Sequence, residues 1–403
     1  MSATDIKITD LGDSCCGCGA CAAKCPKSCI SMVEDAAGFA HPAIDANACI
    51  GCHACESACP ALNPCSADES VRVRWARGKS EELLDSSSSG GMFGLLAEDV
   101  LDDDGVVCGA TWTEDCKRVQ HVLIERAADL DCVMRSKYVQ SAVSREVYEV
   151  IRAALKDGRR VLFAGTACQV AGLRAYLGRL ADSEKFLAVD VICHGVPSPK
   201  LWSEWVSYKE SLSGSNVCDV NMRSKTTGWL SYSAMYKYIA EKDTPYRCES
   251  TVFGNDWYMK AFLANASLRP SCFACPVKHC CGSDITLGDF WGFQNIHPEV
   301  DCSKGISAVI CNTERGVKAF EAVADELESG EATFEQVVVG NPSLVKPVQP
   351  YEHRVEFMAD LCSGMGVEAL MRKYDFKPSF WRRVRGKLGG VKRRLGKLVG
   401  KGR

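Results

Sequence analysis

The sequence predicts a chain of mixed α+β and α/β class, with a small cysteine-rich domain, a mixed-sheet α/β domain and a basic amphipathic C-terminal tail. Three observations predict this order. Eight cysteines stand in two similar runs within the first 60 residues. From about residue 71, amphipathic helical patterns alternate with apolar strand patterns. The last stretch, residues 380–403, carries ten Lys or Arg and no acid.

Composition places the chain among redox or metal-binding proteins. The 403 residues include 25 cysteines. The start, MSATDIKITDLGDS, lacks an apolar leader, and no run reaches the roughly 18 apolar residues of a membrane span. We therefore expect a cytoplasmic chain, in which abundant cysteine favours metal binding or redox chemistry over disulfides.

The first domain, residues 1–65, contains the same cysteine spacing twice, each time ending in proline. The runs are Cys15-x2-Cys18-x2-Cys21-x3-Cys25-Pro26 and Cys49-x2-Cys52-x2-Cys55-x3-Cys59-Pro60. This is the bacterial ferredoxin spacing, in which the fourth cysteine of each run serves the other cluster. We expect two 4Fe–4S clusters, one held by Cys15, Cys18, Cys21 and Cys59, the other by Cys49, Cys52, Cys55 and Cys25. Zinc or disulfides are the alternative, and Cys16, Cys29 and Cys65 are expected to be small buried residues.

The second domain, residues 71–345, reads as alternating strands and helices. The segment 71–78 alternates like an edge strand, and 105–112 with 119–125 reads as a strand pair. Buried strands are expected at 159–165 and 185–195. Helices are expected at 90–105, 145–158, 166–178 and 199–210. A helical extension, 346–379, and the tail, 380–403, follow.

Four stretches of this domain carry candidate chemistry. The SSSSGG run (86–91) opens a helix and suits a phosphate, although Ser-Gly runs are usually ordinary loops. Cys168 and Cys193 each follow a buried strand, where α/β folds place ligands. The loop 268–292 adds Cys272 and Cys275, which complete a four-thiolate site with those two or form a zinc knuckle with Cys280 and Cys281.

The ordered set SSSSGG, SKYVQS (136–141), GTACQVAGL (165–173), ICHGVPSP (192–199), RPSCFACP…SDITLGDFWG (269–292) and KGISAVICNTERG (304–316) resembles the coenzyme F-420 hydrogenase/dehydrogenase beta-subunit family. The resemblance runs from about residue 71 to about 345. It implies an iron–sulfur flavoprotein with FAD beside a third 4Fe–4S cluster on Cys168, Cys193, Cys272 and Cys275. It also implies an FAD site that includes Ser88, Ser89, Gly90, Gly91, Lys137, Thr166 and Gln169. Relatives of this kind often accompany surface-polysaccharide genes.

The expected function is an oxidoreductase that passes electrons between the 4Fe–4S clusters and FAD, and between FAD and a deazaflavin-like or other organic acceptor. His194 is the candidate proton donor, with a hydrogen-bonding role in its turn as the alternative. Asp284, Asp289 and Trp291 are expected to be structural more often than catalytic. A second hypothesis is an electron-transfer subunit that feeds a partner enzyme, and a third is a zinc-stabilised protein.

The tail places Trp381, Val384, Leu388, Val391, Leu395 and Leu398 on one helical face, opposite Arg and Lys. Such a segment suits an anionic membrane surface, so the chain would be peripheral on the inner face of the membrane. A disordered tail is the main alternative. No nucleic-acid partner is expected; the expected partners are a redox protein or ferredoxin and an organic electron donor or acceptor.

Overall fold

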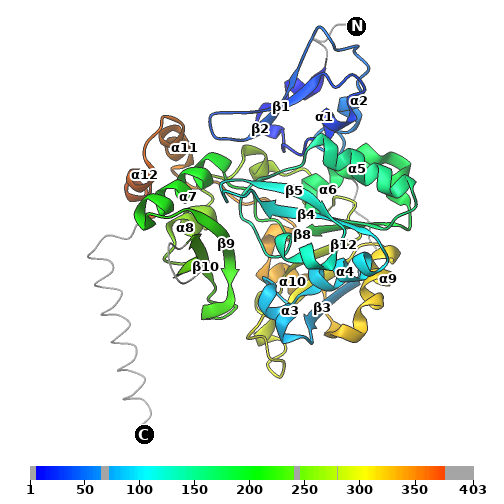
Figure 1. Cartoon of the computed structure of the whole chain (residues 1–403), viewed down its shortest axis with the longest axis vertical. Helices are drawn as coiled ribbons and strands as arrows, with labels where there is room; N and C mark the ends of the chain where they lie inside the picture. The colour runs from blue at the N-terminus through cyan, green and yellow to red at the C-terminus, as the bar shows by residue number, and fades with distance from the viewer. Residues whose placement is uncertain (1–5, 65–71, 240–245, 279, 377–403) are drawn as a thin grey trace.

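The structure, a computed structural model, describes residues 6–64, 72–239, 246–278 and 280–376. Figure 1 shows a small N-terminal lobe next to a larger body, in which a mixed sheet lies among helices, with a second, smaller sheet beside it. The predicted fold class is therefore confirmed. The tail 380–403 and Cys65, which the sequence analysis singled out, lie outside the described residues.

The N-terminal lobe, residues 6–64, is built from short elements around the two cysteine runs. They are the 3-10 helices Lys7–Thr9 and Gly12–Ser14, α1 (Ala20–Lys24), β1 (Ile30–Glu34), β2 (Ala40–Ile44) and α2 (Ala54–Ser57). β1 and β2 form an antiparallel pair. The apolar interior of the lobe is small and consists largely of cysteine, with Ile6, Ile8 and Ile30.

The body is organised around a nine-stranded mixed sheet with the strand order β14-β3-β13-β12-β8-β7-β4-β5-β6. Its strands are β3 (Arg72–Gly78), β4 (Val106–Trp112), β5 (Val119–Ile124), β6 (Ser141–Ala142), β7 (Val161–Thr166), β8 (Phe186–Val191), β12 (Ile285–Asp289), β13 (Ser307–Cys311) and β14 (Leu327–Glu331). The central strands β12, β8, β7 and β4 run parallel, so their carboxyl ends meet at one edge. The predicted pair β4–β5 is antiparallel.

One strand prediction is wrong. The segment 71–78 was expected at an edge because its residues alternate, but β3 pairs with β13 on one side and β14 on the other. The alternation reflects a strand near the end of the sheet, where only part of each face is covered. The covering strand β14, LESGE, is polar and carries little strand signal in the sequence.

Helices cover both faces of this sheet. The helices around it are α3 (Glu81–Ser86), α4 (Met92–Asp102), α5 (Arg145–Lys156), α6 (Ala167–Leu177), α9 (Glu314–Ala322) and α10 (Phe334–Gly340). Apolar residues of α4 and α9 pack with Val107, Leu162 and Val189 on one face. Those of α5 and α6 pack with Val106 and Phe163 on the other, as the alternation of strand side chains requires. The helices begin at capping residues, for example Ser144 before α5, whose hydroxyl accepts from the Val147 amide.

A second unit packs beside the sheet. It contains α7 (Pro199–Ser213), β9 (Val217–Ser224), β10 (Ser233–Ile239), β11 (Tyr246–Val252), α8 (Trp257–Leu263), α11 (Arg354–Cys362) and α12 (Val367–Lys373). The three strands form an antiparallel sheet in the order β11-β10-β9. Its core is rich in aromatic residues, including the buried Trp202, Tyr236 and Tyr258. Helices α11 and α12 lie in the stretch 346–379, which was expected to be helical. No helix in the described ranges is long and apolar enough to span a bilayer.

The lobe is held on the α5–α6 face of the body by side-chain hydrogen bonds to backbone carbonyls in both directions across the junction. The Tyr148 hydroxyl of α5 donates to the Cys18 carbonyl at 2.7 Å, and Lys24 Nζ donates to the Tyr176 carbonyl at 2.7 Å. A Cβ added at Gly172 of α6 would lie 2.9 Å from Cys18 Sγ, so the contact requires glycine. The first cysteine run therefore packs directly against the body.

Candidate functional site: three sets of cysteines

The two cysteine runs adopt the same local backbone. Gly17 and Gly51 occupy equivalent places in the runs and have φ of 69° and 65°. Gly19 and His53, two residues further on, have φ of 82° and 56° at the N-caps of α1 and α2. These left-handed turns curl each run tightly, which is how a short loop can direct several thiols to one side.

One cavity of the lobe collects cysteines from both runs; we call its four predicted ligands the outer set. It is lined by Cys25 from the first run and by Cys49, Cys52 and Cys55 from the second. These are the four that the crossed pattern assigns to one cluster. Cys29 also lines this cavity, with its Sγ 3.3 Å from that of Cys25, and burial raises its pKa to about 12.

The other four cysteines of the runs, Cys15, Cys18, Cys21 and Cys59, form the inner set, which faces the body. All four are buried. Burial raises the pKa of Cys21 to about 12, with the neighbouring Cys15 and Cys59 contributing to the rise. Cys15, Cys21 and Cys59 therefore influence one another electrostatically, as ligands of one cluster would.

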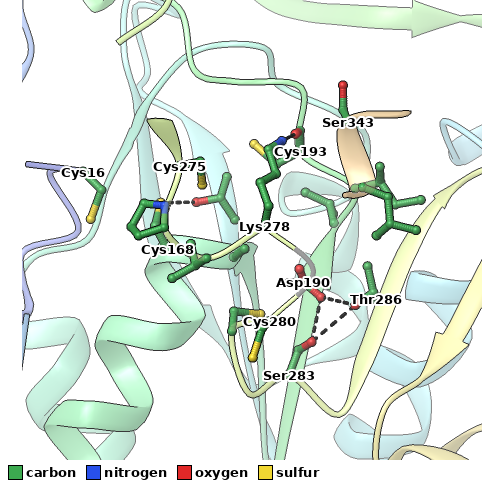
Figure 2. A pocket seen from close by; sticks show the side chains of 18 of the residues that line it. Cys16, Cys168, Asp190, Cys193, Cys275, Lys278, Cys280, Ser283, Thr286 and Ser343 are labelled. Atoms are coloured by element: carbon green, nitrogen blue, oxygen red, sulfur yellow. Dashed lines mark hydrogen bonds between the residues drawn. The ribbon is translucent and has the colours of Figure 1, made fainter. Parts of the chain in front are cut away.

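The body contains a cavity of about 200 Å³ that is lined by the predicted ligands Cys168, Cys193, Cys272 and Cys275, the body set. Cys168 lies in the first turn of α6, just after β7, and Cys193 lies just after the neighbouring parallel strand β8. Cys272 is part of the 3-10 helix Pro270–Ala274, and Cys275 follows it. Strand order in the sheet thus brings together thiols that are remote in sequence (Figure 2).

The cavity offers these thiols polar contacts. The Val196 amide donates to Cys272 Sγ at 3.5 Å, and Thr166 Oγ1 lies 3.2 Å from Cys168 Sγ. Lys278 Nζ donates to the Cys193 carbonyl. Burial raises the pKa of Cys272 to about 12 and that of Cys193 above its ordinary range, and the Lys278 ammonium offsets part of both shifts. Bound iron would stabilise the thiolates at this buried place.

The four thiols of the body set fit a 4Fe–4S cluster in number and chemistry. Across the described ranges, no three His, Cys, Asp or Glu side chains converge as ligands of a single metal ion. Cys280 and Cys281 of the alternative zinc knuckle line the same cavity. Figure 2 shows Cys280 at its lower end beside Ser283, away from Cys193.

Cys16 is a residue whose place the sequence analysis missed. It is buried, as expected, but it also lines the body cavity together with Cys168 (Figure 2). The nearby Cys16 thiol raises the pKa of the Cys168 thiol, and burial raises it further. The signal was present in the pair Cys15-Cys16, because adjacent side chains point apart and so face two different sites.

The Ser-Gly part of the predicted FAD site, Ser88 to Gly91, lies around the start of α4. Most hydrogen-bonding groups of the SSSSGG run are occupied. Ser88 Oγ accepts from the Ser136 amide at 2.8 Å, Ser89 Oγ donates to the Ile306 carbonyl, and the Gly90 amide donates to Ser307 Oγ. Gly91 caps α4 in a left-handed conformation. Ser87 Oγ, by contrast, is buried and has no hydrogen-bond partner in the described residues.

Cations gather beside this loop, and the sequence analysis missed two of them. Arg223 is 2% exposed; it pairs with Asp289 at 2.9 Å, and its buried Nε has no partner among the described residues. Lys225 Nζ donates to three carbonyls, including that of Ser89 at 2.7 Å. Lys137 Nζ donates to the Met134 carbonyl, and burial lowers its pKa to about 7. Lys225 and Lys137 hydrogen-bond only to neutral carbonyls, and Arg223 has one N–H group without a partner among the described residues. Buried cations in such surroundings are suited to binding an anionic ligand.

Three predicted residues already have intramolecular partners. Thr166 and Gln169 form a capping box at the start of α6, and Gln169 Nε2 also donates to Ser141 Oγ at 2.9 Å. His194 lies in the wall of the body cavity, where its Nε2 is 2.6 Å from Asn265 Oδ1, and burial lowers its pKa. The structure brings Thr166 and His194 to the thiol cavity but does not bring Gln169 into its lining.

The fold and the three cysteine sets define a class: an iron–sulfur electron-transfer protein with a two-run cysteine lobe docked on an α/β body. Residues 158–336 match the family model for the C terminus of the coenzyme F420 hydrogenase/dehydrogenase beta subunit. Residues 14–63 match the model "4Fe-4S dicluster domain". These matches confirm the resemblance to the coenzyme F420 hydrogenase/dehydrogenase beta-subunit family over residues 158–336, and the 4Fe–4S dicluster domain that the cysteine spacing predicted over residues 14–63.

Solved structures include a chain of the F420-reducing [NiFe] hydrogenase complex from Methanosarcina barkeri, in a study of xenon derivatization. It is 18% identical, with a TM-score of 0.43, over 76% of this chain and 94% of that chain. A search of curated proteins returned no match.

Proposed function

We propose that this protein is an iron–sulfur flavoprotein oxidoreductase that moves electrons between the N-terminal lobe and an organic acceptor or donor. In this proposal the outer and inner sets hold one 4Fe–4S cluster each, the body set holds a third, and FAD binds at the start of α4. Bound clusters would supply one-electron transfer. Their iron would offset the negative charge of the buried thiolate ligands.

The observation that supports this proposal most directly is the position of Cys16. Its neighbour Cys15 belongs to the inner set, whereas Cys16 lines the body cavity together with Cys168. One peptide bond therefore links a residue of the inner set to a residue in the wall of the body cavity. Such continuity suits electron transfer between sites, and an isolated structural zinc site would not require it.

The flavin part of the proposal depends on the cations near SSSSGG. Arg223, Lys225 and Lys137 would neutralise a diphosphate, aided by the Ser87 hydroxyl and the start of α4. Bound FAD would couple one-electron carriers to two-electron chemistry. His194, in the wall of the same cavity as the thiols, would hold a proton for the organic acceptor at its ring nitrogen.

The second candidate is an electron-transfer subunit that feeds a partner enzyme and has no substrate of its own. The outer set favours a protein partner at that end, because Cys52 is exposed and the nearby Ile50 is 57% exposed.

The tail 380–403 would add an anionic membrane surface as a partner. Truncation at residue 379 tests the tail: loss of sedimentation with vesicles containing phosphatidylserine supports it, and unchanged sedimentation contradicts it.

Composition of the protein purified without oxygen tests the main proposal. Iron, sulfide, zinc and flavin are counted per chain. Three clusters give about twelve irons, and the lobe alone gives about eight. About twelve irons with one FAD is the expected result. About eight irons with zinc and no flavin would contradict both the body cluster and the flavoprotein assignment.

A turnover assay then separates the two candidates. The isolated holoprotein is reduced with dithionite and mixed with a deazaflavin or another small organic acceptor. Turnover supports the enzyme. Clusters that are reduced and reoxidised only by a protein carrier, with no small acceptor consumed, support the subunit that feeds a partner.

A further inference from the structure

Arg269 is a buried arginine at the junction of the N-terminal lobe and the body. It is 1% exposed and lies immediately before the 3-10 helix that carries Cys272. Its side chain extends into the lobe, where Nε donates to the Cys15 carbonyl at 2.6 Å and Nη2 donates to the Ala40 carbonyl at 2.9 Å. A guanidinium from the body thus holds the backbone of a residue of the inner set.

The backbone of the same residue is tied to the body set. The Cys272 amide donates to the Arg269 carbonyl at 3.0 Å, and the Arg269 amide donates to the Val196 carbonyl at 2.9 Å. The Val196 amide in turn donates to Cys272 Sγ. Arg269 is therefore in direct contact with one residue of each of two thiol sets.

The charge of Arg269 has only neutral hydrogen-bonding partners in the described chain. Besides the two carbonyls, they are Gln140 Oε1 at 3.0 Å and the ring of His41 at 3.4 Å. The guanidinium also lies 5.3 Å from the centre of the Phe39 ring. Burial, together with the charge of Arg269, lowers the pKa of His41, which favours the neutral imidazole.

A buried cation without a counter-ion is costly, so a source of negative charge nearby is expected. The carboxylate of Asp35 reaches this network only through His41, at 3.3 Å. The thiol sets on either side are the natural source, because a 4Fe–4S cluster with four thiolates is an anion. Each such site gains one further negative charge when it accepts an electron, with no bond made or broken.

We propose that Arg269 is an electrostatic positioning residue. Its charge raises the reduction potentials of the two clusters that the inner set and the body set would bind. Its charge stabilises the more negative, reduced form at both places. Its hydrogen bonds hold Cys15, and with it Cys16, against the body cavity. The inference rests on clusters bound at these sets and does not depend on FAD.

Potentials measured on the full holoprotein test this proposal. Arg269→Met, Arg269→Lys and Arg269→Gln are purified without oxygen, their iron is counted, and each is titrated with dithionite and mediators under EPR. In Arg269→Met we expect about a tenfold lower ratio of reduced to oxidised form at fixed potential for both sets, or about 59 mV for one electron. The signal of the outer set is expected to stay unchanged. Arg269→Lys, which keeps the charge, is expected to recover most of the shift.

Arg145→Met is the matched control. Arg145 also donates from the body to lobe carbonyls, those of Ala22 and Cys25, but it is half-buried and lies 3.9 Å from Glu149. We expect it to leave the inner and body potentials unchanged. Equal shifts in Arg145→Met and Arg269→Met would show that docking alone is responsible and would overturn the proposal.

If Arg269→Met loses iron, the comparison of Arg269→Lys with Arg269→Gln still decides. A lower potential in the Gln variant than in the Lys variant supports the role of charge, and equal potentials refute it. Absence of flavin would contradict the proposed flavoprotein without changing these cluster signals. If only the inner signal is present, its shift alone tests the electrostatic role.

Discussion

The two cysteine-lined cavities of this protein are built in different ways. The cavity of the lobe takes its thiols from two short runs whose equivalent turns have nearly the same left-handed φ values. The cavity of the body takes its thiols from the ends of β7 and β8 and from a loop about 80 residues further on. One site is specified by local spacing, and the other exists only when the sheet has formed. A substitution in the lobe should therefore act locally, whereas the body site depends on the whole fold.

The largest expected effect comes from Cys193→Ser, which removes a remote member of the body set. We expect iron to fall from about twelve to about eight per chain, with the lobe clusters retained. Cys280→Ala is the matched control, because Cys280 lines the same cavity. If Cys280→Ala loses the iron and Cys193→Ser keeps it, the loop binds metal by itself and the contrast between local and remote sites fails.

Asp256 is a buried acid that lines neither cavity. It shows how much free energy of unfolding is lost when an ordinary buried carboxyl group becomes charged. Asp256 caps α8, and burial raises its pKa to about 6. Because this value lies above the unfolded pKa of about 3.9, its contribution to stability is full below pH 4 and is lost as pH rises through 6. Asp256→Asn is expected to be relatively more stable at pH 7 than at pH 4, by up to about 3 kcal/mol, in urea unfolding. An equal pH dependence in both proteins would contradict this.

The contact between lobe and body is tested at Gly172. A valine there would bring its Cβ against Cys18 Sγ and Ala20, where 2.9 and 3.1 Å are available. We expect a loss of about 1–3 kcal/mol in unfolding free energy and a changed EPR signal of the inner set. Gly254→Ala is the control, because a Cβ there meets nothing within 4 Å. An inner-set signal identical to wild type would mean that the lobe cluster does not sense the body.

The smallest effect is expected from Cys29→Ala in the lobe. Cys29 lines the outer cavity but lies outside the ferredoxin spacing. Its loss is expected to leave iron unchanged and to cost about 1 kcal/mol, as for a small buried apolar group. In the wild type, Cys25 Sγ lies only 3.3 Å from Cys29 Sγ. The substitution Cys25→Ser is nevertheless expected to lose a cluster, because Cys25 belongs to the ferredoxin spacing. Iron loss in Cys29→Ala would show that spacing alone does not select the ligands.

The helices and strands of the body were largely predictable because their patterns are periodic. The pair β4–β5, the strands β7 and β8, and the helices α4 to α7 lie where the spacing of apolar residues placed them. The position of β3 was not predictable, because its neighbour β14 is short and polar. Arg223 lies in β9, and Lys225 begins the 3-10 helix that follows this strand. Neither gave a signal, because basic residues are usually solvent-exposed and these two become buried only in the tertiary structure.

The sequence by itself determined the two cysteine runs of the lobe and the grouping of their thiols, because ligands a few residues apart are positioned by local turns. It also indicated the ends of β7 and β8 as sites, because parallel strands share an edge. Only the tertiary structure decided that Cys16 enters the body cavity and that Arg269 spans both sets. Those contacts join residues far apart in the chain, and only the docking of the lobe on α5 and α6 brings these residues together.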